Sequence, residues 1–354
     1  MSAGTSSLAR RKLLGILSGA WLGQACYAVV KLGVPDLLAA GPRAVDDLAA
    51  ATGAHPRVLH RLLRALAGAG VLRQTGPGTF ALSSTGELLR SDAPGSTHLV
   101  ALMHGEEVLR SFAEIMHTVR TGAPAFEKVY GRPFYEYLDD NPDAASIFIG
   151  SMGDQPVPAG LSTCDLSGVA TLVDVGGGNG TLLAEVLTAY QGMRGVLLER
   201  PDAVAAARAR LGEAGLADRV SFVEGSFFDA VPAGGDVYVL ARVLHNWNDE
   251  HALEILRRVH AAAPPGARLV VLEELLPEAG PPPTADAPTP SGGTAAGGPA
   301  AAGLGDLLML VTLEGFDRTG VEYRELLAAT GFDVLAVRHV SGRQTGGVVE
   351  AMRI

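Results

Sequence analysis

Residues 172–187 read LVDVGGGNGTLLAEVL, and this stretch decides the fold of the C-terminal half of the chain. Leu172–Val175 is a short apolar run that ends in glycines, and Thr181–Leu187 then carries apolar residues at helical spacing. A buried strand that turns through glycines into a helix is the opening unit of a parallel α/β sheet. The stretch therefore predicts a strand, a tight turn and a helix.

Short apolar runs recur along the rest of the chain, most of them separated by helical stretches. Further strand candidates are residues 195–198, 220–223, 237–240 and 269–272, and helix candidates are residues 203–211 and 250–263. This alternation predicts a Rossmann-like, doubly wound parallel sheet. The last two runs, 334–340 and 348–354, flank Ser341-Gly342-Arg343 and pair best as an antiparallel hairpin, which makes a seven-stranded sheet.

The first hundred residues predict a mainly α-helical winged-helix domain. Val45–Ala51 and Pro56–Ala69 have helical periodicity, and Val71–Arg73 and Phe80–Leu82 flank a Gly76-Pro77-Gly78 turn. Such a module either binds DNA or packs against protein. Between residues 41 and 95 six arginines face four acids, and the whole chain carries a net charge of −10. Because phosphate neutralisation needs a larger basic surplus, we expect a packing module and no nucleic-acid partner.

The apolar run Leu13–Ala28 follows Arg10-Arg11-Lys12 and resembles a secretory signal. It reaches membrane-spanning length only by including Gln24 and Lys31, so burial in a dimer interface is the preferred interpretation. The two cysteines offer neither a metal-ligand spacing nor a disulfide framework. We therefore expect a cytoplasmic protein with no membrane partner.

Two other segments complete the predicted organisation. Residues 101–160 are expected to be a helical connector, and residues 161–354 the catalytic domain. Within that domain residues 277–303, rich in Pro, Gly, Ala and Thr, are expected to form a flexible low-complexity loop.

The glycine turn and an acid beyond it indicate an adenosine ligand. Glycines allow a ligand to touch backbone at a strand end, and Glu199, at the end of the next strand, can accept hydrogen bonds from both ribose hydroxyls. A dinucleotide site wants Gly-x-Gly-x-x-Gly, whereas here the glycines fall at 176, 178 and 180 after Asp174. An acid beside the turn suits the ammonium and sulfonium of S-adenosylmethionine, which is favoured over NAD.

His245 follows the fourth predicted strand, where doubly wound sheets place ligand sites. Methyl transfer to oxygen requires removal of the hydroxyl proton, and a phenol with a pKa of about 10 is roughly 4 kcal/mol from ionised at pH 7. An imidazole is a suitable acceptor for that proton. Glu273 and Asp317 are each candidates to hold the ring. His251 and His260 are expected to face solvent, and no cluster has metal-ligand spacing, so no metal is expected.

At this point the chain resembles the class I O-methyltransferases that carry an N-terminal winged-helix dimerisation domain. That family includes plant caffeic acid and flavonoid O-methyltransferases and bacterial enzymes of natural-product and polyketide pathways. The resemblance rests on LVDVGGGNGTLLAEVL, VSFVEGSFFDAVP, VLHNWNDEHALEILRRV and LEGFDRTGVEYRELLAATGF, and it runs from about residue 15 to the end.

The resemblance implies roles for particular residues. His245 would be the catalytic base, flanked by Glu273 and Asp317. The methyl donor would contact Asp174, Gly176, Gly178, Glu199, Ser226, Phe227 and Arg242. The acceptor pocket would be lined by Met103, His104, Phe112, Met116, Phe148, Met152 and Asn246. The first helices would intertwine with those of a second subunit in a homodimer.

Three positions depart from the family pattern. Many relatives have aspartate where this chain has Asn246, and a basic residue where it has Ala241. Asp317 replaces the usual glutamate, so its contact with His245 is expected to be longer or water-mediated.

The expected activity is O-methylation of a small hydroxylated aromatic or polyketide-type molecule. The alternatives are methylation of carbon or nitrogen, a donor-binding relative that decarboxylates or hydroxylates its substrate, NAD-dependent chemistry, and a ligand-sensing DNA-binding regulator.

Overall fold

The computed structural model describes residues 3–153, 157–278, 299–340 and 346–354. The chain forms two compact units. Unit 1 comprises residues 1–113 and 142–155, and unit 2 comprises residues 114–141 and 156–354. The helical segment 101–160 is thus divided between the two units, and the three-domain boundaries drawn from the sequence remain a prediction.

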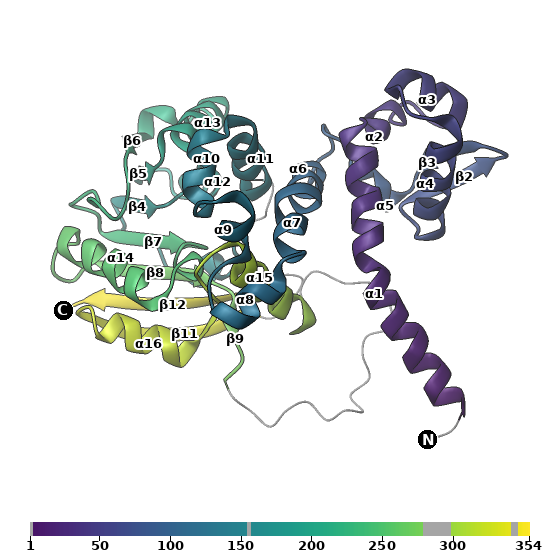
Figure 1. Ribbon diagram of the computed structural model, residues 1–354. Coiled ribbons are helices and arrows are strands. Elements are labelled where there is room, and N and C mark those ends of the chain that lie inside the picture. Colours follow the sequence, from purple (N-terminus) through teal and green to yellow (C-terminus); the bar gives the residue numbers. More distant parts are fainter. Residues whose placement is uncertain (1–2, 154–156, 279–298, 341–345) are drawn as a thin grey trace. The chain divides into compact units, whose positions relative to one another are not determined.

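Unit 1 consists of helices around one small sheet (Figure 1). Its helices are α1 (Ala3–Lys31), α2 (Val34–Leu37), α3 (Val45–Thr52), α4 (Pro56–Gly68), α5 (Ser84–Glu87), α6 (His98–Met103), the π-helix His104–Val108, α7 (Leu109–Phe112) and α11 (Pro142–Gly153). Its strands are β1 (Arg43–Ala44), β2 (Leu72–Gly76) and β3 (Thr79–Leu82), in the order β1-β3-β2.

The helix–helix–wing pattern is confirmed. In α4, Leu59, Leu63 and Leu66 repeat at helical spacing and are buried, as an amphipathic helix requires. The wing strands pair antiparallel with Leu72 opposite Leu82. The additional strand β1 was not predicted, because two residues are too few to show a period of two.

Helix α1 has a long apolar surface that the rest of unit 1 leaves exposed to solvent. Ala25, Val29 and Val30 are buried, whereas Leu13, Leu17 and Trp21 are exposed, Trp21 to 76%. Residues 7–31 are long and apolar enough to cross a membrane, but only 17% of the most apolar window is buried. A signal sequence and a helix that another chain covers would both look like this, so composition does not choose between them.

Unit 2 contains a seven-stranded sheet with the order β11-β12-β8-β7-β4-β5-β6. The strands are β4 (Thr171–Val175), β5 (Arg194–Glu199), β6 (Val220–Glu224), β7 (Val237–Ala241), β8 (Arg268–Glu273), β11 (Phe332–Val340) and β12 (Gly346–Arg353). Strands β4 to β8 are parallel, and β12 runs antiparallel to both β8 and β11. All seven predicted strands and the C-terminal hairpin are therefore confirmed.

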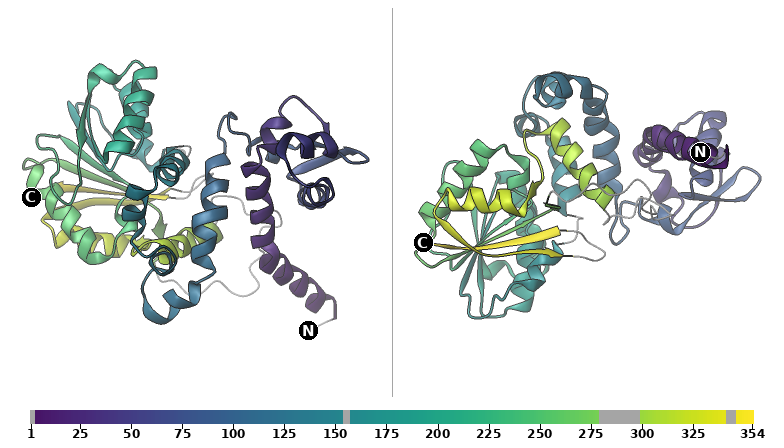
Figure 2. Two further views of the ribbon diagram at one scale, coloured as in Figure 1. Left: turned by 45° about the horizontal axis from the view of Figure 1, so that its top comes forward. Right: turned by 90° about the horizontal axis from the view of Figure 1, so that it is seen from below.

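Helices cover both faces of this sheet, as Figure 2 shows. They are α12 (Thr181–Ala189), α13 (Pro201–Glu213), α14 (Asp249–Ala262) and α16 (Gly320–Ala328). Successive residues of a strand enter opposite cores: Tyr238 and Leu240 of β7 pack with α14 and α16, and Val239 packs with α12 and α13. Burial on both faces explains why these strands are continuous apolar runs rather than alternating ones.

Several shorter elements complete unit 2. They are α8 (Ile115–Thr121), α9 (Ala125–Tyr130), α10 (Phe134–Asp140), α15 (Pro299–Thr312), the 3₁₀ turns Ala159–Thr163, Ala217–Arg219 and Leu244–Asn246, and the paired strands β9 (Leu275–Leu276) and β10 (Arg318–Thr319). The predicted loop 277–303 is wrong at its end, because α15 begins at Pro299. Residues 279–298 of that loop lie outside the described residues.

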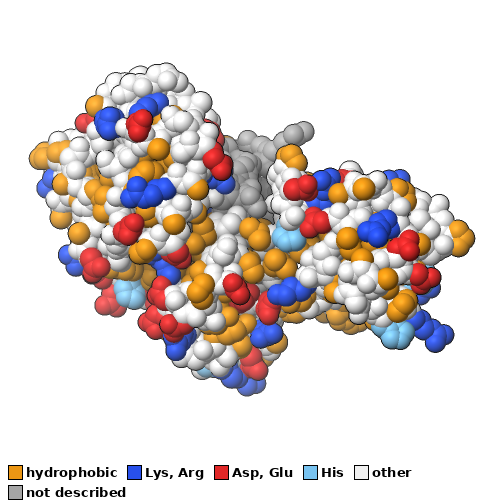
Figure 3. Space-filling model, turned by 90° about the horizontal axis from the view of Figure 1, so that it is seen from above, with side chains coloured by type: hydrophobic (Ala, Val, Ile, Leu, Met, Phe, Trp, Pro, Cys, Tyr) orange, Lys and Arg blue, Asp and Glu red, His pale blue; other side chains and the backbone are white. Residues whose placement is uncertain are grey.

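Charges of both signs are interspersed with apolar side chains on the face drawn in Figure 3. A surface that tracks a phosphate backbone would instead concentrate Lys and Arg in a stripe. The absence of a nucleic-acid partner remains a prediction.

Candidate active site

Three glycines of the turn between β4 and α12 have no room for a side chain, namely Gly176, Gly177 and Gly180, whereas Gly178 faces open space. Gly176 has φ +74°, and a Cβ there would lie 2.9 Å from Val243 Cγ2 and 3.5 Å from the Phe227 ring. Gly180, with φ +76°, would meet Leu211 at 3.0 Å. The glycines therefore keep the backbone bare and allow the sharp entry into the helix. Phe227, predicted to contact the donor, is placed beside this turn.

Asp174 is a buried acid directly below the turn. It is 1% exposed, and neither of its carboxylate oxygens has a hydrogen-bond partner among the described residues. Burial, together with the nearby Glu199 charge, raises the pKa of Asp174 to about 7. A Cβ at Gly177 would lie 2.5 Å from its Oδ2. An unpartnered buried carboxyl is costly unless a donor or cation completes it, and the positively charged end of S-adenosylmethionine fits that need.

Glu199 ends β5 and is tied to the same turn. Its Oε2 accepts a hydrogen bond from the Gly178 N–H at 3.0 Å, and its Oε1 accepts one from the Arg200 N–H at 2.8 Å. Burial raises the pKa of Glu199, and those backbone donors partly oppose the shift. Each carboxylate oxygen keeps a lone pair for a further donor, which suits a ribose diol.

His245 stands at the carboxyl end of β7, the parallel neighbour of β4. The chain reverses at Arg242, whose φ of +56° lies in the left-handed region, and the Arg242 N–H donates to Leu272 O at 2.9 Å. A non-glycine residue pays strain of about 1–2 kcal/mol in that conformation. Such strain persists only where surrounding contacts impose it, and the 3₁₀ turn Leu244–Asn246 follows after Val243.

Two buried carboxylates face the His245 ring. Nδ1 lies 3.4 Å from Asp317 Oδ1 and 3.7 Å from Glu273 Oε2. The Asp317 distance is long for a hydrogen bond, as expected for the shorter acid. Glu273 Oε1 accepts hydrogen bonds from the Val243 and Leu244 N–H groups. The parallel pairing of β9 with β10, Leu275 opposite Arg318, brings the two acids to one end of the sheet.

The net effect of the surroundings is to raise the pKa of His245. Burial of His245 opposes protonation, but the carboxylates of Glu273 and Asp317 outweigh it and raise the pKa of His245. Burial raises the pKa of Glu273, while the nearby His245 lowers it. The ring, 18% exposed, can therefore receive a proton from one side while two acids stabilise the resulting cation from the other.

The remaining predicted residues lie in different places. Ser226 accepts a hydrogen bond from the Phe228 N–H, and the Asn246 side chain donates to Arg242 O. Met103 of α6 and the helix α11, which carries Phe148 and Met152, pack together in unit 1. His104 begins the π-helix and Phe112 ends α7, also in unit 1, whereas Met116 is exposed on α8 of unit 2. Their role in acceptor binding stays a prediction.

Two aromatic residues near the site were not predicted as functional. Tyr135 stacks on Trp247 with ring centroids 5.5 Å apart. Burial raises the pKa of Tyr135, and both Glu199 and the Asn246 side chain lie close enough to affect it. Nothing in the sequence of α10 marks Tyr135, because it is separated from its partners by more than sixty residues. Trp247 stands two residues after His245, and this short spacing could have marked it as a candidate site residue.

His251 and His260, expected to face solvent, are both partly exposed. The His251 side chain is 42% exposed while its Nδ1 contacts Glu314, and the His260 ring packs edge-to-face on Phe332 at 5.4 Å. Among the described residues, no group of three or more His, Cys, Asp or Glu side chains is placed to hold a metal ion.

Comparison with known families finds two matches. The O-methyltransferase domain matches residues 112–333, and the O-methyltransferase dimerisation domain matches residues 14–92.

Individual relatives extend along nearly the whole chain. A phenazine O-methyltransferase of Lysobacter antibioticus is 38% identical and covers 97% of this chain and 96% of its own. An 8-amino-8-demethylriboflavin N,N-dimethyltransferase of Streptomyces davaonensis is also 38% identical, over 89% of this chain and 88% of its own. The solved O-methyltransferase from neocarzinostatin biosynthesis, in complex with S-adenosylmethionine and 2-hydroxy-5-methyl naphthoic acid, is 34% identical with a TM-score of 0.78, over 94% and 96% of the two chains.

The glycine turn yields a prediction about the donor. Gly177→Ala places a methyl group against the Asp174 carboxylate, so we expect affinity for S-adenosylhomocysteine to fall by at least about tenfold, equivalent to 1.4 kcal/mol. Isothermal titration calorimetry measures it. Gly212→Ala, in α13, is the matched control because a Cβ there meets nothing within 4 Å. Equal affinity for both variants would contradict this account of the turn.

Proposed function

The chain belongs to the S-adenosylmethionine-dependent O-methyltransferases that carry an N-terminal dimerisation domain. On this premise we propose that it methylates a hydroxyl group of a small aromatic or polyketide-type natural product. His245 acts as the general base in this proposal. The observation that carries the proposal is the His245 ring at a strand end, backed by two buried carboxylates and adjacent to the bare glycine turn.

His245 has the chemistry that a hydroxyl acceptor needs. A phenol is mostly un-ionised at neutral pH, so its oxygen becomes a strong nucleophile only as its proton leaves. The ring takes that proton, and Glu273 and Asp317 stabilise the imidazolium. A base within proton-transfer reach of a held acceptor also reduces the entropic cost of the reaction.

The residues around the turn fit the methyl donor. When bound, S-adenosylmethionine supplies the electrophilic methyl group. In this proposal Asp174 and Glu199 receive its charged and hydroxylated ends, and Gly176 and Gly178 leave the backbone open to it. Phe227 lies beside Gly176, which supports a contact with the donor, and Ser226 and Arg242 are proposed to contact it as well.

Nitrogen methylation is the second candidate, because a relative of equal identity is an N,N-dimethyltransferase. An aromatic amine is already neutral at pH 7 and attacks through its lone pair, so it has less need of a base held by two acids. The pair of carboxylates on His245 therefore favours oxygen.

A panel of matched acceptors tests the proposed activity. Hydroxylated naphthoates or phenazines and their amino analogues are incubated with the donor, and products are analysed by mass spectrometry. A gain of 14 mass units on the hydroxyl compounds supports the proposal. Transfer to the amines alone would contradict the proposal in favour of N-methylation. Loss of carbon dioxide or gain of oxygen would contradict it in favour of decarboxylation or hydroxylation.

We also propose that the protein is a homodimer in the cytoplasm. The match of residues 14–92 to a dimerisation domain supports this, as does the apolar surface of α1 that unit 1 leaves exposed. Contiguous exposed apolar surface of this kind marks an interaction site.

Removal of the base is the first test of mechanism. His245→Ala should lower kcat by about 10²–10⁴-fold. Its affinity for S-adenosylhomocysteine should stay within about twofold of the wild-type value, because the base acts on the acceptor and not on the donor. Steady-state kinetics and calorimetry measure the two effects. His339→Ala, exposed on β11, is the control. Near wild-type turnover in His245→Ala would remove this residue from the mechanism.

The acids should set the pH dependence. The neutral ring is the active form, and the carboxylates raise the pKa of His245. Asp317→Asn removes one of them, so the pKa falls and the acidic limb of the kcat profile moves to lower pH. The plateau should drop by about tenfold because the imidazolium loses support. Exposed Asp333→Asn is the control, and an unmoved limb in Asp317→Asn argues against ring–acid coupling.

Dimer formation should depend on α1. Trp21→Glu combined with Leu17→Glu puts charges on its exposed apolar surface, so we expect dissociation to monomers in sedimentation velocity at micromolar concentration. Leu335→Glu, which changes an exposed leucine of β11, should leave the dimer unchanged. A double variant that still sediments as a dimer would place the interface elsewhere.

A further inference from the structure

Arg318 is a buried cation beside the base. It is 0% exposed and is among the largest fully buried side chains. A buried guanidinium is costly unless its donors are satisfied. The site residues described above do not include it, although it directly follows Asp317.

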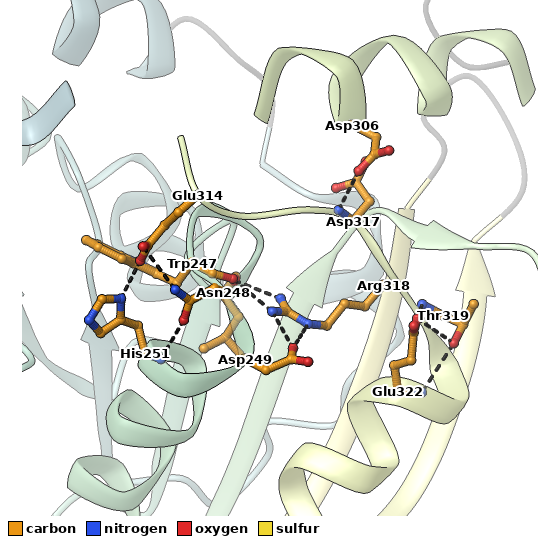
Figure 4. Close-up of polar contacts among 11 residues, drawn as sticks. Trp247, Asn248, Asp249, His251, Asp306, Glu314, Asp317, Arg318, Thr319 and Glu322 are labelled. Atoms are coloured by element: carbon orange, nitrogen blue, oxygen red, sulfur yellow. Dashed lines mark hydrogen bonds and ion pairs between the residues drawn. The ribbon is translucent and has the colours of Figure 1, made fainter. Parts of the chain in front are cut away.

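The guanidinium of Arg318 donates hydrogen bonds to the backbone of the turn that carries His245. Nη1 donates to Leu244 O at 3.0 Å and Nη2 donates to Trp247 O at 2.8 Å. These two carbonyls stand immediately before His245 and immediately after Asn246. Nε and Nη2 also donate to Asp249 Oδ1, at 3.0 and 2.8 Å, in the first turn of α14 (Figure 4).

We propose that Arg318 is a positioning residue that holds the His245 turn in register with its two acids, an inference that rests on the role of His245 proposed above. The side chain acts through the backbone carbonyls of the turn and through the Asp249 carboxylate, to which it donates its hydrogen bonds.

Residues 315–318 supply both Arg318, which holds the turn, and Asp317, one of the two acids that face the His245 ring. Asp317 contacts the ring, and its N–H donates to Asp306 Oδ1 at 3.0 Å. The guanidinium carbon of Arg318 lies over the Phe316 ring, 4.2 Å from the ring centroid. Gly315 packs so closely that a Cβ would lie 2.0 Å from His245 O. Residues 315–318 therefore form one segment that packs against the turn carrying His245. A shift of Arg318 changes the distance from His245 to Asp317.

Arginine is required for this geometry rather than any cation. Its planar fork carries five donors and can bridge two carbonyls and a carboxylate at once. A lysine ammonium is a compact charge with three donors on a flexible stem. It can meet Asp249, but it cannot span the two carbonyls of the turn in the same orientation.

Displacement of the turn would change the electrostatics of His245. The charged groups that influence the ring are Glu273 at the end of β8, Asp317 before β10, and Arg242 at the end of β7. Glu273 also accepts hydrogen bonds from the turn itself. A turn that moves away from both acids loses the interactions that favour the imidazolium.

Arg318→Lys is the test. We expect kcat to fall by about 100-fold, the loss typical of a displacement of about 1 Å, with S-adenosylhomocysteine affinity little changed. The pKa of His245, followed by NMR titration of labelled histidines and assigned with His245→Ala, should fall. A variant with wild-type kcat and an unchanged His245 titration would overturn the proposal.

The NMR titration separates a failure of this inference from a failure of the proposed function. It needs no acceptor, so it reports the ring position even if the wild-type protein methylates no hydroxyl compound. Arg258→Lys is the control, because Arg258 lies on α14 and pairs only loosely with Glu254 at 3.5 Å on the exposed surface. It should match the wild-type protein in both measurements.

A second variant covers the case in which Arg318→Lys does not fold. Asp249 is 63% exposed in its side chain and forms the ion pair with Arg318, so Asp249→Asn loosens the guanidinium without opening the core. We expect the same changes at a smaller size, a kcat loss of about two- to fivefold, because an ion pair with an exposed partner contributes up to about 1 kcal/mol, together with a lowered His245 pKa. Wild-type values for both quantities in Asp249→Asn would also overturn the proposal.

Discussion

One buried ionic arrangement, the His245 imidazole facing the carboxylates of Glu273 and Asp317, governs the architecture around it. Two buried acids repel each other and lose hydration, so they require nearby donors and a group that can become positive. Backbone N–H groups of the turn donate to Glu273 Oε1, whereas Oε2, 3.7 Å from His245 Nδ1, has no hydrogen-bond partner among the described residues and relies on the charge of the ring. The same arrangement that stabilises the buried acids therefore prepares the ring to accept a proton.

The arrangement costs local strain, which the surrounding structure absorbs. Arg242 adopts a left-handed backbone conformation to start the turn, and Arg318 is buried to hold it. Asp174 is buried under the glycine turn, and its carboxylate has no hydrogen-bond partner in the part of the chain that the structure describes. Each feature would be unfavourable in a protein selected only for stability. Their clustering at the carboxyl ends of adjacent parallel strands is the physical signature of a site built for ligands.

The fold was largely predictable because its strands are buried on both faces. Continuous apolar runs such as 237–240 and 269–272, separated by helix-length segments, leave few other architectures. The strands β1, β9 and β10 were not predictable, since segments of two residues carry no readable period. The π-helix His104–Val108 lies between the helices α6 and α7, and side-chain spacing does not distinguish it from them. The contacts of the two histidines of α14 were not predictable for a related reason: their partners Glu314 and Phe332 come from other segments.

The sequence by itself determined the chemistry available: glycines after a strand, an acid after the next strand, and one histidine at a strand end, all of which are local patterns. Only the tertiary structure decided which side chains meet. Arg318 and Tyr135 gained their places from segments distant in the chain, and the distance from His245 to Asp317 depends on how β10 pairs with β9. Local patterns follow from backbone periodicity, which a sequence records, whereas long-range contacts follow from packing, which a single sequence does not.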